Sequence, residues 1–182
     1  ELVEAGGSPD IEVAVERALK DRDSMGGIVE CVTSGLPVGL GEPFFDSVES
    51  LISHLVFSIP AVRGIEFGAG FAAAGMKGSE HNDEIMNLHG VTKTNHAGGV
   101  NGGITNGNIL RFRVAVKPTS SISTLQHTID MRTGEPVDLI VEGRHDICIA
   151  LRVPVIMEAV TAIVIADLLM IEQKIGRVRK KI

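Results

Sequence analysis

Three short segments of the sequence combine residue types that could hold a phosphate-bearing ligand. The first is the glycine-rich run of residues 95–107, where backbone N–H groups could come close to a ligand because glycine carries no Cβ. The second begins at Lys117, whose positive charge precedes three hydroxyl side chains in residues 119–121. The third contains Arg144 and Asp146, a permanent cation near a carboxylate. Together they predict a site for an anion or a phosphate-bearing cofactor.

Other chemistries fit the sequence less well. Gly68-Ala69-Gly70 partly matches the dinucleotide-binding fingerprint, but glycines at positions 75 and 78 interrupt the helix that this fold places directly after it. The acids and histidines of the same region match no standard metal-ligand spacing, so we expect no metal site. These residues are His81, Asp83, Glu84, His89 and His96. The sequence also lacks the nucleophile elbow of a serine hydrolase.

The composition narrows the class of ligand. The 182 residues have a mass of 19.3 kDa and a formal net charge of −6, which removes the broad positive field of a general nucleic-acid binder. Aromatic residues make up only 3%, with no Trp or Tyr, which argues against base-stacking platforms. We therefore expect one domain that binds a small phosphorylated molecule and no nucleic acid.

Three further features bear on the compartment. Cys31 and Cys148 lie far apart and lack metal-type spacing, which favours reduced thiols and a cytoplasmic protein. The sequence begins at Glu1 rather than Met, so we expect a processed or truncated product. The longest apolar stretch, residues 153–171, carries Glu158 and Asp167 on opposite faces of a helix. That arrangement favours a buried helix over a membrane span.

Hydrophobic spacing predicts a mixture of helices and strands. Helices are expected at residues 11–20, after the start signal Ser8-Pro9-Asp10, at 45–59, and at 153–175, the last with a solvated basic tail. Strands are expected at 28–32, 64–67, 109–116, 126–131 and 137–142, with a hairpin turn at 133–135. Residues 68–108 read as a long loop, which is usually functional or poorly ordered. These elements predict an α+β fold with antiparallel strands packed on helices.

At these segments the sequence resembles the chorismate synthase family. The similarity is carried by motifs in the family's order and spacing: Asp23-Ser24-Met25-Gly26-Gly27, residues 39–43, residues 63–68, the glycine-rich run, Lys117-Pro118-Thr119 and Gly143-Arg144-His145-Asp146. The resemblance implies a β-α-β sandwich that assembles as a homotetramer. Residues 1–182 would then be the carboxy-terminal portion of such a domain, with the amino-terminal half absent.

The resemblance also implies an activity. Family members are lyases that convert 5-enolpyruvylshikimate 3-phosphate to chorismate and phosphate by a 1,4-elimination, in the shikimate pathway of aromatic amino-acid biosynthesis. They require reduced FMN although the reaction has no net redox change, and the flavin is thought to lend an electron transiently as phosphate leaves. The resemblance leaves open whether the protein reduces its own flavin with NADPH or depends on a separate flavin reductase.

The resemblance further implies roles for single residues. Asp146 matches the family's aspartate near the flavin N5, which is proposed to assist proton transfer. The flavin contacts of the family fall on Pro60, Ala61, Gly102, Lys117, Pro118, Thr119, Ser120, Ser121 and Arg144. Among these, Lys117 and the hydroxyls would hold phosphate, while Arg144 would be the cation beside Asp146 and stabilise negative charge on flavin or substrate.

One departure from the family limits the expected activity. In the family, the half that lies outside this sequence carries two proposed catalytic histidines and several substrate-binding arginines. None of the six histidines here can be assigned those histidine roles. We therefore expect the 182-residue chain to be inactive by itself. The alternative is a non-catalytic module that binds flavin or phosphate, or that serves assembly.

Overall fold

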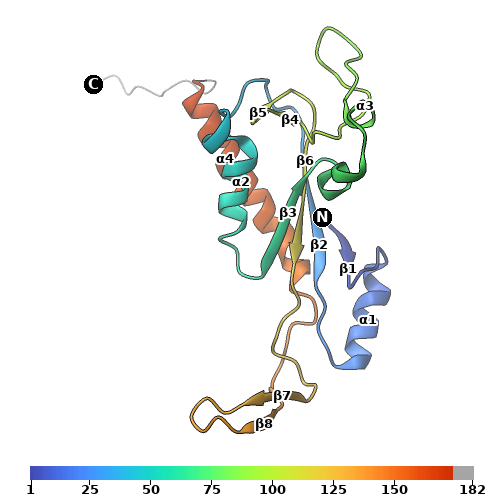
Figure 1. Cartoon of the computed structure of the whole chain (residues 1–182), viewed down its shortest axis with the longest axis vertical. Helices are drawn as coiled ribbons and strands as arrows, with labels where there is room; N and C mark the ends of the chain where they lie inside the picture. The colour runs from blue at the N-terminus through green and yellow to red at the C-terminus, as the bar shows by residue number, and fades with distance from the viewer. Residues whose placement is uncertain (174–182) are drawn as a thin grey trace, which may run out of the picture.

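The computed structural model describes residues 1–173 and confirms an α+β fold. Its centre is an antiparallel sheet with the strand order β1-β2-β6-β3. The strands are β1 (Leu2–Ala5), β2 (Gly27–Thr33), β6 (Leu110–Val116) and β3 (Val62–Phe67). Two helices, α2 (Val48–Val56) and α4 (Val153–Ile171), pack side by side on one face of this sheet (Figure 1). This sheet and its helix layer are half of the expected β-α-β sandwich.

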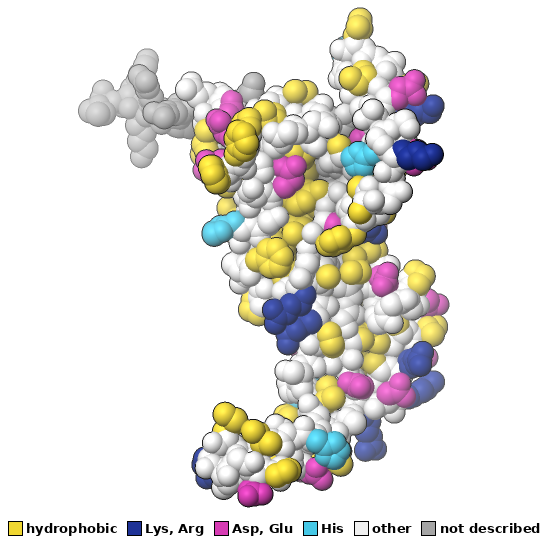
Figure 2. Space-filling model, in the orientation of Figure 1, with side chains coloured by type: hydrophobic (Ala, Val, Ile, Leu, Met, Phe, Trp, Pro, Cys, Tyr) yellow, Lys and Arg dark blue, Asp and Glu magenta, His cyan; other side chains and the backbone are white. Residues whose placement is uncertain are grey.

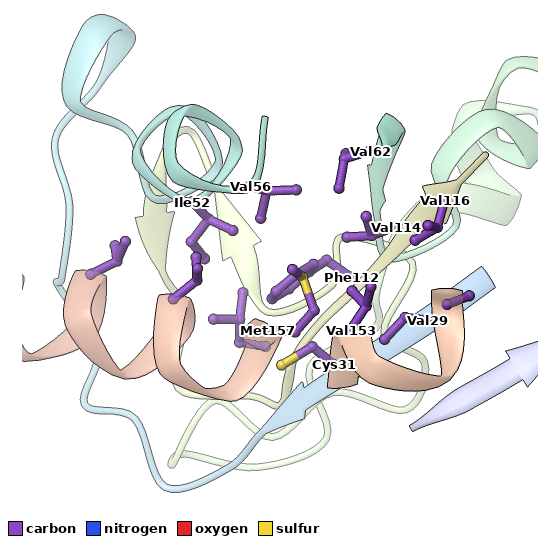
Figure 3. Close-up of a cluster of buried hydrophobic side chains, with 14 of the residues drawn as sticks. Val29, Cys31, Ile52, Val56, Val62, Phe112, Val114, Val116, Val153 and Met157 are labelled. Carbon is purple, nitrogen blue, oxygen red and sulfur yellow. The ribbon is translucent and has the colours of Figure 1, made fainter. Parts of the chain in front are cut away.

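The core lies between the sheet and the two helices. Every second residue of β6 is buried, and these residues are Leu110, Phe112, Val114 and Val116. The buried residues of α4 recur at helical spacing instead: Val153, Met157, Val160, Thr161, Val164, Ile165 and Leu168. Figure 3 shows Ile52 of α2, Phe112 of β6 and Met157 of α4 drawn together in this cluster. The core determines strand register, because a shift of one residue would turn the buried row to solvent.

Helix α4 is buried on one face only. Val155, Ile163 and Met170 on its other face are 66%, 60% and 55% exposed, so the predicted burial holds for one face of the helix and not for this one. Among the described residues, Ile149–Ile171 is the one helical segment long and apolar enough to cross a membrane, by length and composition alone. The helix ends at Ile171 rather than residue 175. The basic tail (Arg177, Arg179, Lys180 and Lys181) lies outside the described residues.

The capping residues explain where helices α1 and α2 begin. Helix α1 (Ile11–Asp21) starts after Asp10, whose carboxylate accepts the N–H of Val13, so Asp10 rather than Ser8 is its cap. Helix α2 starts after Ser47, whose hydroxyl oxygen accepts the N–H of Ser50. The cap shortens the predicted helix 45–59 at its start, and the residues before it form a separate 3-10 turn at Phe44–Asp46. Strand β1 was not predicted.

A two-stranded hairpin projects away from the sheet and helices (Figure 1). It consists of β7 (Gln126–Ile129) and β8 (Pro136–Leu139), and we call residues 126–139 the arm. Its turn carries Gly134 at φ +77°, as the predicted hairpin turn requires. Every residue of β8 is exposed. The two segments that join the arm to the sheet and helices, residues 117–125 and 140–147, are called its stems.

The long loop 68–108 is held by hydrogen bonds within itself. It contains a 3-10 turn, the short helix α3 (Gly78–His81) and the strands β4 (Val100–Asn101) and β5 (Ile104–Thr105). The Asp83 carboxylate accepts bonds from the Thr94 hydroxyl and from the backbone N–H groups of His96 and Ala97. Burial raises the pKa of Asp83, but these hydrogen bonds outweigh burial and hold the pKa below its ordinary value. Asp83 therefore acts as an ionised anchor of the loop.

Candidate functional site

Antiparallel pairing brings three segments to one end of the sheet: the start of β2, the Pro60-Ala61 turn before β3 and the Lys117 segment after β6. Val116, the last residue of β6, lies opposite both Gly27 of β2 and Val62 of β3. Lys117 therefore leaves the sheet beside the residues that precede these two strands. The backbone N–H of Lys117 donates to the carbonyl of Ala61 at 2.9 Å. Pro60, Ala61 and the Lys117 segment, which are far apart in sequence, thus meet as the resemblance implies.

The turn that carries Pro60 and Ala61 has an unusual backbone. Ala61 has φ +73°, in the left-handed region that residues with a Cβ rarely occupy. This conformation points its carbonyl at Lys117 while β3 continues into the sheet. Strained residues of this kind persist only where surrounding structure holds them, and they are common at ligand sites.

The hydroxyl segment after Lys117 contains a buried atom without a partner. Ser24, from the segment before β2, donates its hydroxyl hydrogen to the carbonyl of Thr119 at 2.5 Å. The hydroxyl oxygen of Thr119 itself is buried and has no hydrogen-bond partner within the described part of the chain. A buried polar atom left alone costs free energy, so a ligand oxygen at this position would be favoured. Pro118 and Ser120 are exposed, and Ser121 is half-buried.

A cavity of about 360 Å³ lies next to this segment, between the start of β2 and the third motif. Its lining includes Arg22, Asp23 and Ser24 from the segment before β2, and Gly143, His145 and Asp146 from the third motif. Ser24, which bonds to Thr119, and the predicted catalytic carboxylate of Asp146 therefore line the same cavity.

The cation beside Asp146 is Arg152, not Arg144. The guanidinium of Arg152 donates to the Asp146 carboxylate at 2.6 Å, and both side chains are largely solvent-exposed. Arg144 is exposed and does not line the cavity. The expectation that Arg144 pairs with Asp146 was wrong, because the chain turns after residue 148 into the 3-10 turn Ile149–Arg152 and brings Arg152 back. No sequence pattern indicates this contact, which joins residues six positions apart.

Gly102 and the rest of the glycine-rich run lie at the opposite end of the sheet. Gly102 occupies the turn between β4 and β5, and this region bonds to Leu40 and Val48 near the start of β6. The seven residues of β6 separate that end from Lys117, a span of roughly 20 Å. Within the described chain, Gly102 therefore does not join the other predicted flavin contacts.

Three glycines of this run allow backbone segments to cross at close range. A Cβ on Gly98 would lie 2.4 Å from the backbone nitrogen of Gly68, and one on Gly99 would lie 2.5 Å from the carbonyl oxygen of Ile109. A Cβ on Gly103 would lie 2.6 Å from the carbonyl oxygen of Glu42. Each glycine lets two backbone segments pass at a distance that no other residue permits. Packing alone therefore accounts for glycine at these three positions, and the approach of the run to a ligand stays a prediction.

Neither a metal cluster nor a disulfide is present among residues 1–173. No group of three His, Cys, Asp or Glu side chains there could hold a metal ion. His96 and Asp83 are neighbours, but Asp83 is engaged with the loop backbone. Cys31 and Cys148 are both buried and free, and the Cys31 sulfur lies 3.4 Å from the Thr161 hydroxyl.

A comparison with known protein families gives a match over most of the chain. The family profile described as chorismate synthase matches residues 2–170. The chain belongs to the chorismate synthase family. It is 64% identical over 179 residues to chorismate synthase of Chitinophaga pinensis, which covers 98% of this chain and 54% of that relative. It is 48% identical over 169 residues to chorismate synthase of Dehalococcoides mccartyi, which covers 92% of this chain and 46% of the relative.

The chain is also similar to a plant enzyme and to a solved structure. It shares 48% identity over 151 residues with the chloroplastic chorismate synthase 2 of Solanum lycopersicum, covering 81% of this chain and 35% of the relative. A crystal structure of a chorismate synthase matches with a TM-score of 0.71 and 30% identity, over 92% of this chain and 43% of the other. The chain thus spans about half the length of the curated chorismate synthases it matches.

Proposed function

We propose that the protein containing this chain is a lyase that forms chorismate and phosphate from 5-enolpyruvylshikimate 3-phosphate with the help of reduced FMN. Family membership supports chorismate formation. The observation that carries the proposal is the meeting of Ala61, Lys117, Thr119 and Asp146 around one end of the sheet.

The residues at this end fit a phosphorylated cofactor. Lys117 supplies a positive charge, Ser120 and Ser121 add hydroxyl donors, and the buried Thr119 hydroxyl has no partner among residues 1–173. A phosphate oxygen is a strong acceptor for such groups, so these residues would hold FMN through its phosphate. The chemistry that reduced flavin supplies here is transient electron donation to a substrate that is losing phosphate.

Asp146 is the proposed base of the reaction. The elimination breaks the C–O bond to phosphate, which leaves with the electron pair of that bond, and a ring C–H bond, whose hydrogen leaves as a proton. The C–H electrons and the shifted ring double bond make the two conjugated double bonds of the product, so an electron lent by reduced flavin would have to return to the flavin. Arg152 holds the Asp146 carboxylate at the edge of the cavity through its 2.6 Å contact. A carboxylate positioned in this way can accept a proton from the ring or from the cofactor.

The remaining proposals concern the complete protein. We propose that this chain alone is inactive, because it covers only 54% of the Chitinophaga pinensis relative, and the resemblance assigns the catalytic histidines and the substrate-binding arginines to the other half. We also propose a homotetrameric, cytoplasmic enzyme whose flavin is reduced either by NADPH on the protein or by a separate reductase. Gly102, which stands apart here, would reach the flavin only in such an assembly.

The test is chorismate formation by the full-length protein, assayed anaerobically with 5-enolpyruvylshikimate 3-phosphate and dithionite-reduced FMN. We expect Asp146→Asn to lower turnover by roughly 10²–10⁴. Asp21→Asn is the matched control, because Asp21 is an exposed carboxylate paired only loosely with Arg17, and it should leave turnover unchanged. We expect no chorismate from residues 1–182 alone.

Three outcomes would contradict the proposal. Normal turnover of Asp146→Asn would remove Asp146 from the chemistry. Chorismate formation by the chain alone would contradict its proposed dependence on further residues. Flavin binding by the full-length protein without any chorismate would favour the alternative, a non-catalytic binding module.

A further inference from the structure

We propose that Ser24 is a positioning residue of the flavin site, and that residues 22–26 act as a clasp that joins the two stems of the arm. This inference rests on the proposed function, since it concerns the same end of the sheet. Ser24 would not touch the reacting atoms. It would set the position of Thr119, whose unpartnered hydroxyl the proposed function assigns to the cofactor phosphate.

Three hydrogen bonds define the clasp. The Ser24 hydroxyl donates to the carbonyl of Thr119 at 2.5 Å, and the Thr124 hydroxyl donates to the carbonyl of Arg22 at 3.1 Å. Both bonds tie the clasp to the first stem. The backbone N–H of Met25 donates to the carbonyl of Ile147 at 2.8 Å, which ties it to the second stem directly after Asp146. Residues 22–25 thus hold the Lys117 motif and the Asp146 motif at once.

Glycine at position 26 lets the clasp lie this close. A Cβ on Gly26 would lie 2.4 Å from the carbonyl oxygen of Val116 and 3.3 Å from the ring of Pro118. Since the Val116 carbonyl is backbone, the Lys117 segment would have to move away. The position therefore requires glycine for packing and not for a left-handed backbone.

The clasp matters because the stems have little other support. The arm beyond them is exposed on both faces and does not pack on the core. The nearest fixed point of the first stem is the bond from Lys117 to Ala61, and Thr119 lies two residues further on. Without the Ser24 bond, the Thr119 backbone would be free to sample positions in which its hydroxyl no longer faces the site.

The experiment measures FMN affinity of the full-length protein by flavin fluorescence titration. Ser24→Ala removes one hydroxyl and should weaken FMN binding about tenfold, the effect of losing one good hydrogen bond. Ser24→Thr keeps the hydroxyl and should restore affinity to within about twofold. Thr92→Val is the matched control, because the Thr92 hydroxyl also donates to a backbone carbonyl, at 2.6 Å to Thr94, in a loop away from the site.

Thermal unfolding distinguishes a positioning role of Ser24 from a purely structural role. Ser24→Ala and Thr92→Val should show similar midpoints without ligand, but only Ser24→Ala should lose part of the midpoint rise that saturating FMN produces. Wild-type affinity of Ser24→Ala, while Lys117→Ala binds weakly, would overturn the clasp and leave the flavin site standing. Unchanged affinity of Lys117→Ala would overturn the proposed site itself.

Discussion

The sheet-and-helix body and the arm are both built on antiparallel strand pairing, yet only the body buries its side chains. Phe112 on β6 is 1% exposed, whereas Met131 at the tip of the arm is 88% exposed. The arm also exposes Ile129, Val137 and Leu139, the stems expose Leu125 and Ile140, and apolar side chains are visible in this region at the bottom of Figure 2.

This difference shows that hydrogen bonds between two strands do not by themselves fix where the strands lie relative to the rest of the protein. The β7–β8 ladder is regular, with four residue pairs from Gln126↔Leu139 to Ile129↔Pro136, but an isolated two-stranded hairpin is only marginally stable. The body is positioned by its core. The candidate site lies between the two regions, so Ala61 and Lys117 are held by the body, while Thr119 and Asp146 depend on the stems and the clasp.

The largest expected effect is in the body. Phe112→Ala empties the centre of the core, where Phe112 stacks near Phe67 at a ring-centroid distance of 5.5 Å. We expect a loss of about 3–5 kcal/mol in the free energy of unfolding, measured with urea. Met131→Ala in the arm is the control and should change it by less than about 0.5 kcal/mol. An equal loss in both variants would mean that the arm belongs to the same packed unit.

An intermediate effect is expected in the loop that covers the upper end of the sheet. Asp83→Asn removes the charge that accepts three loop hydrogen bonds, and should destabilise the protein by about 1–3 kcal/mol at neutral pH. Because the folded pKa of Asp83 is lowered, its contribution is present above the unfolded value of about 3.9 and is lost as pH falls through the folded value. Urea unfolding at several pH values should show the two proteins converging below about pH 4. A difference that persists in acid would contradict the ionised anchor.

The smallest effect is expected at the arm's turn. Gly134 has φ +77°, and a Cβ there would meet no atom within 4 Å, so Gly134→Ala costs only backbone strain. We expect amide hydrogen exchange in β7 to speed up about fivefold, for a strain near 1 kcal/mol. Amides of β2 and β6 should exchange at wild-type rates. Faster exchange in those strands as well would show that the arm and body open together.

Much of the fold could be predicted from local patterns. The alternation of β6 and the apolar spacing of α2 and α4 predicted their type and approximate place, because each pattern reports one buried face. Helix ends were less accurate. Ser8 and Asp10 are both possible caps for α1, and Ser47 is the cap of α2. Only the backbone path decides which side chain accepts a free N–H group at the start of a helix.

The candidate site could be predicted in part. The Lys117 segment and Asp146 carry motif residues that point to a phosphate and a base, and the structure places them near one another. Gly102, Arg152 and the clasp could not be placed in this way. Their positions depend on strand register and on a 3-10 turn. Both bring together residues that no periodic sequence pattern connects.

The sequence by itself determined the type of most elements and the family, and it predicted which residues bind phosphate, because these depend on side-chain chemistry and short-range spacing. The tertiary structure alone decided that Val116 lies between Gly27 and Val62, and hence that Lys117 meets Ala61 while the glycine-rich run lies at the far end. The physical reason is that register is selected by burial of the whole sheet face against α2 and α4. The register depends on all the buried side chains together, so no single motif determines it.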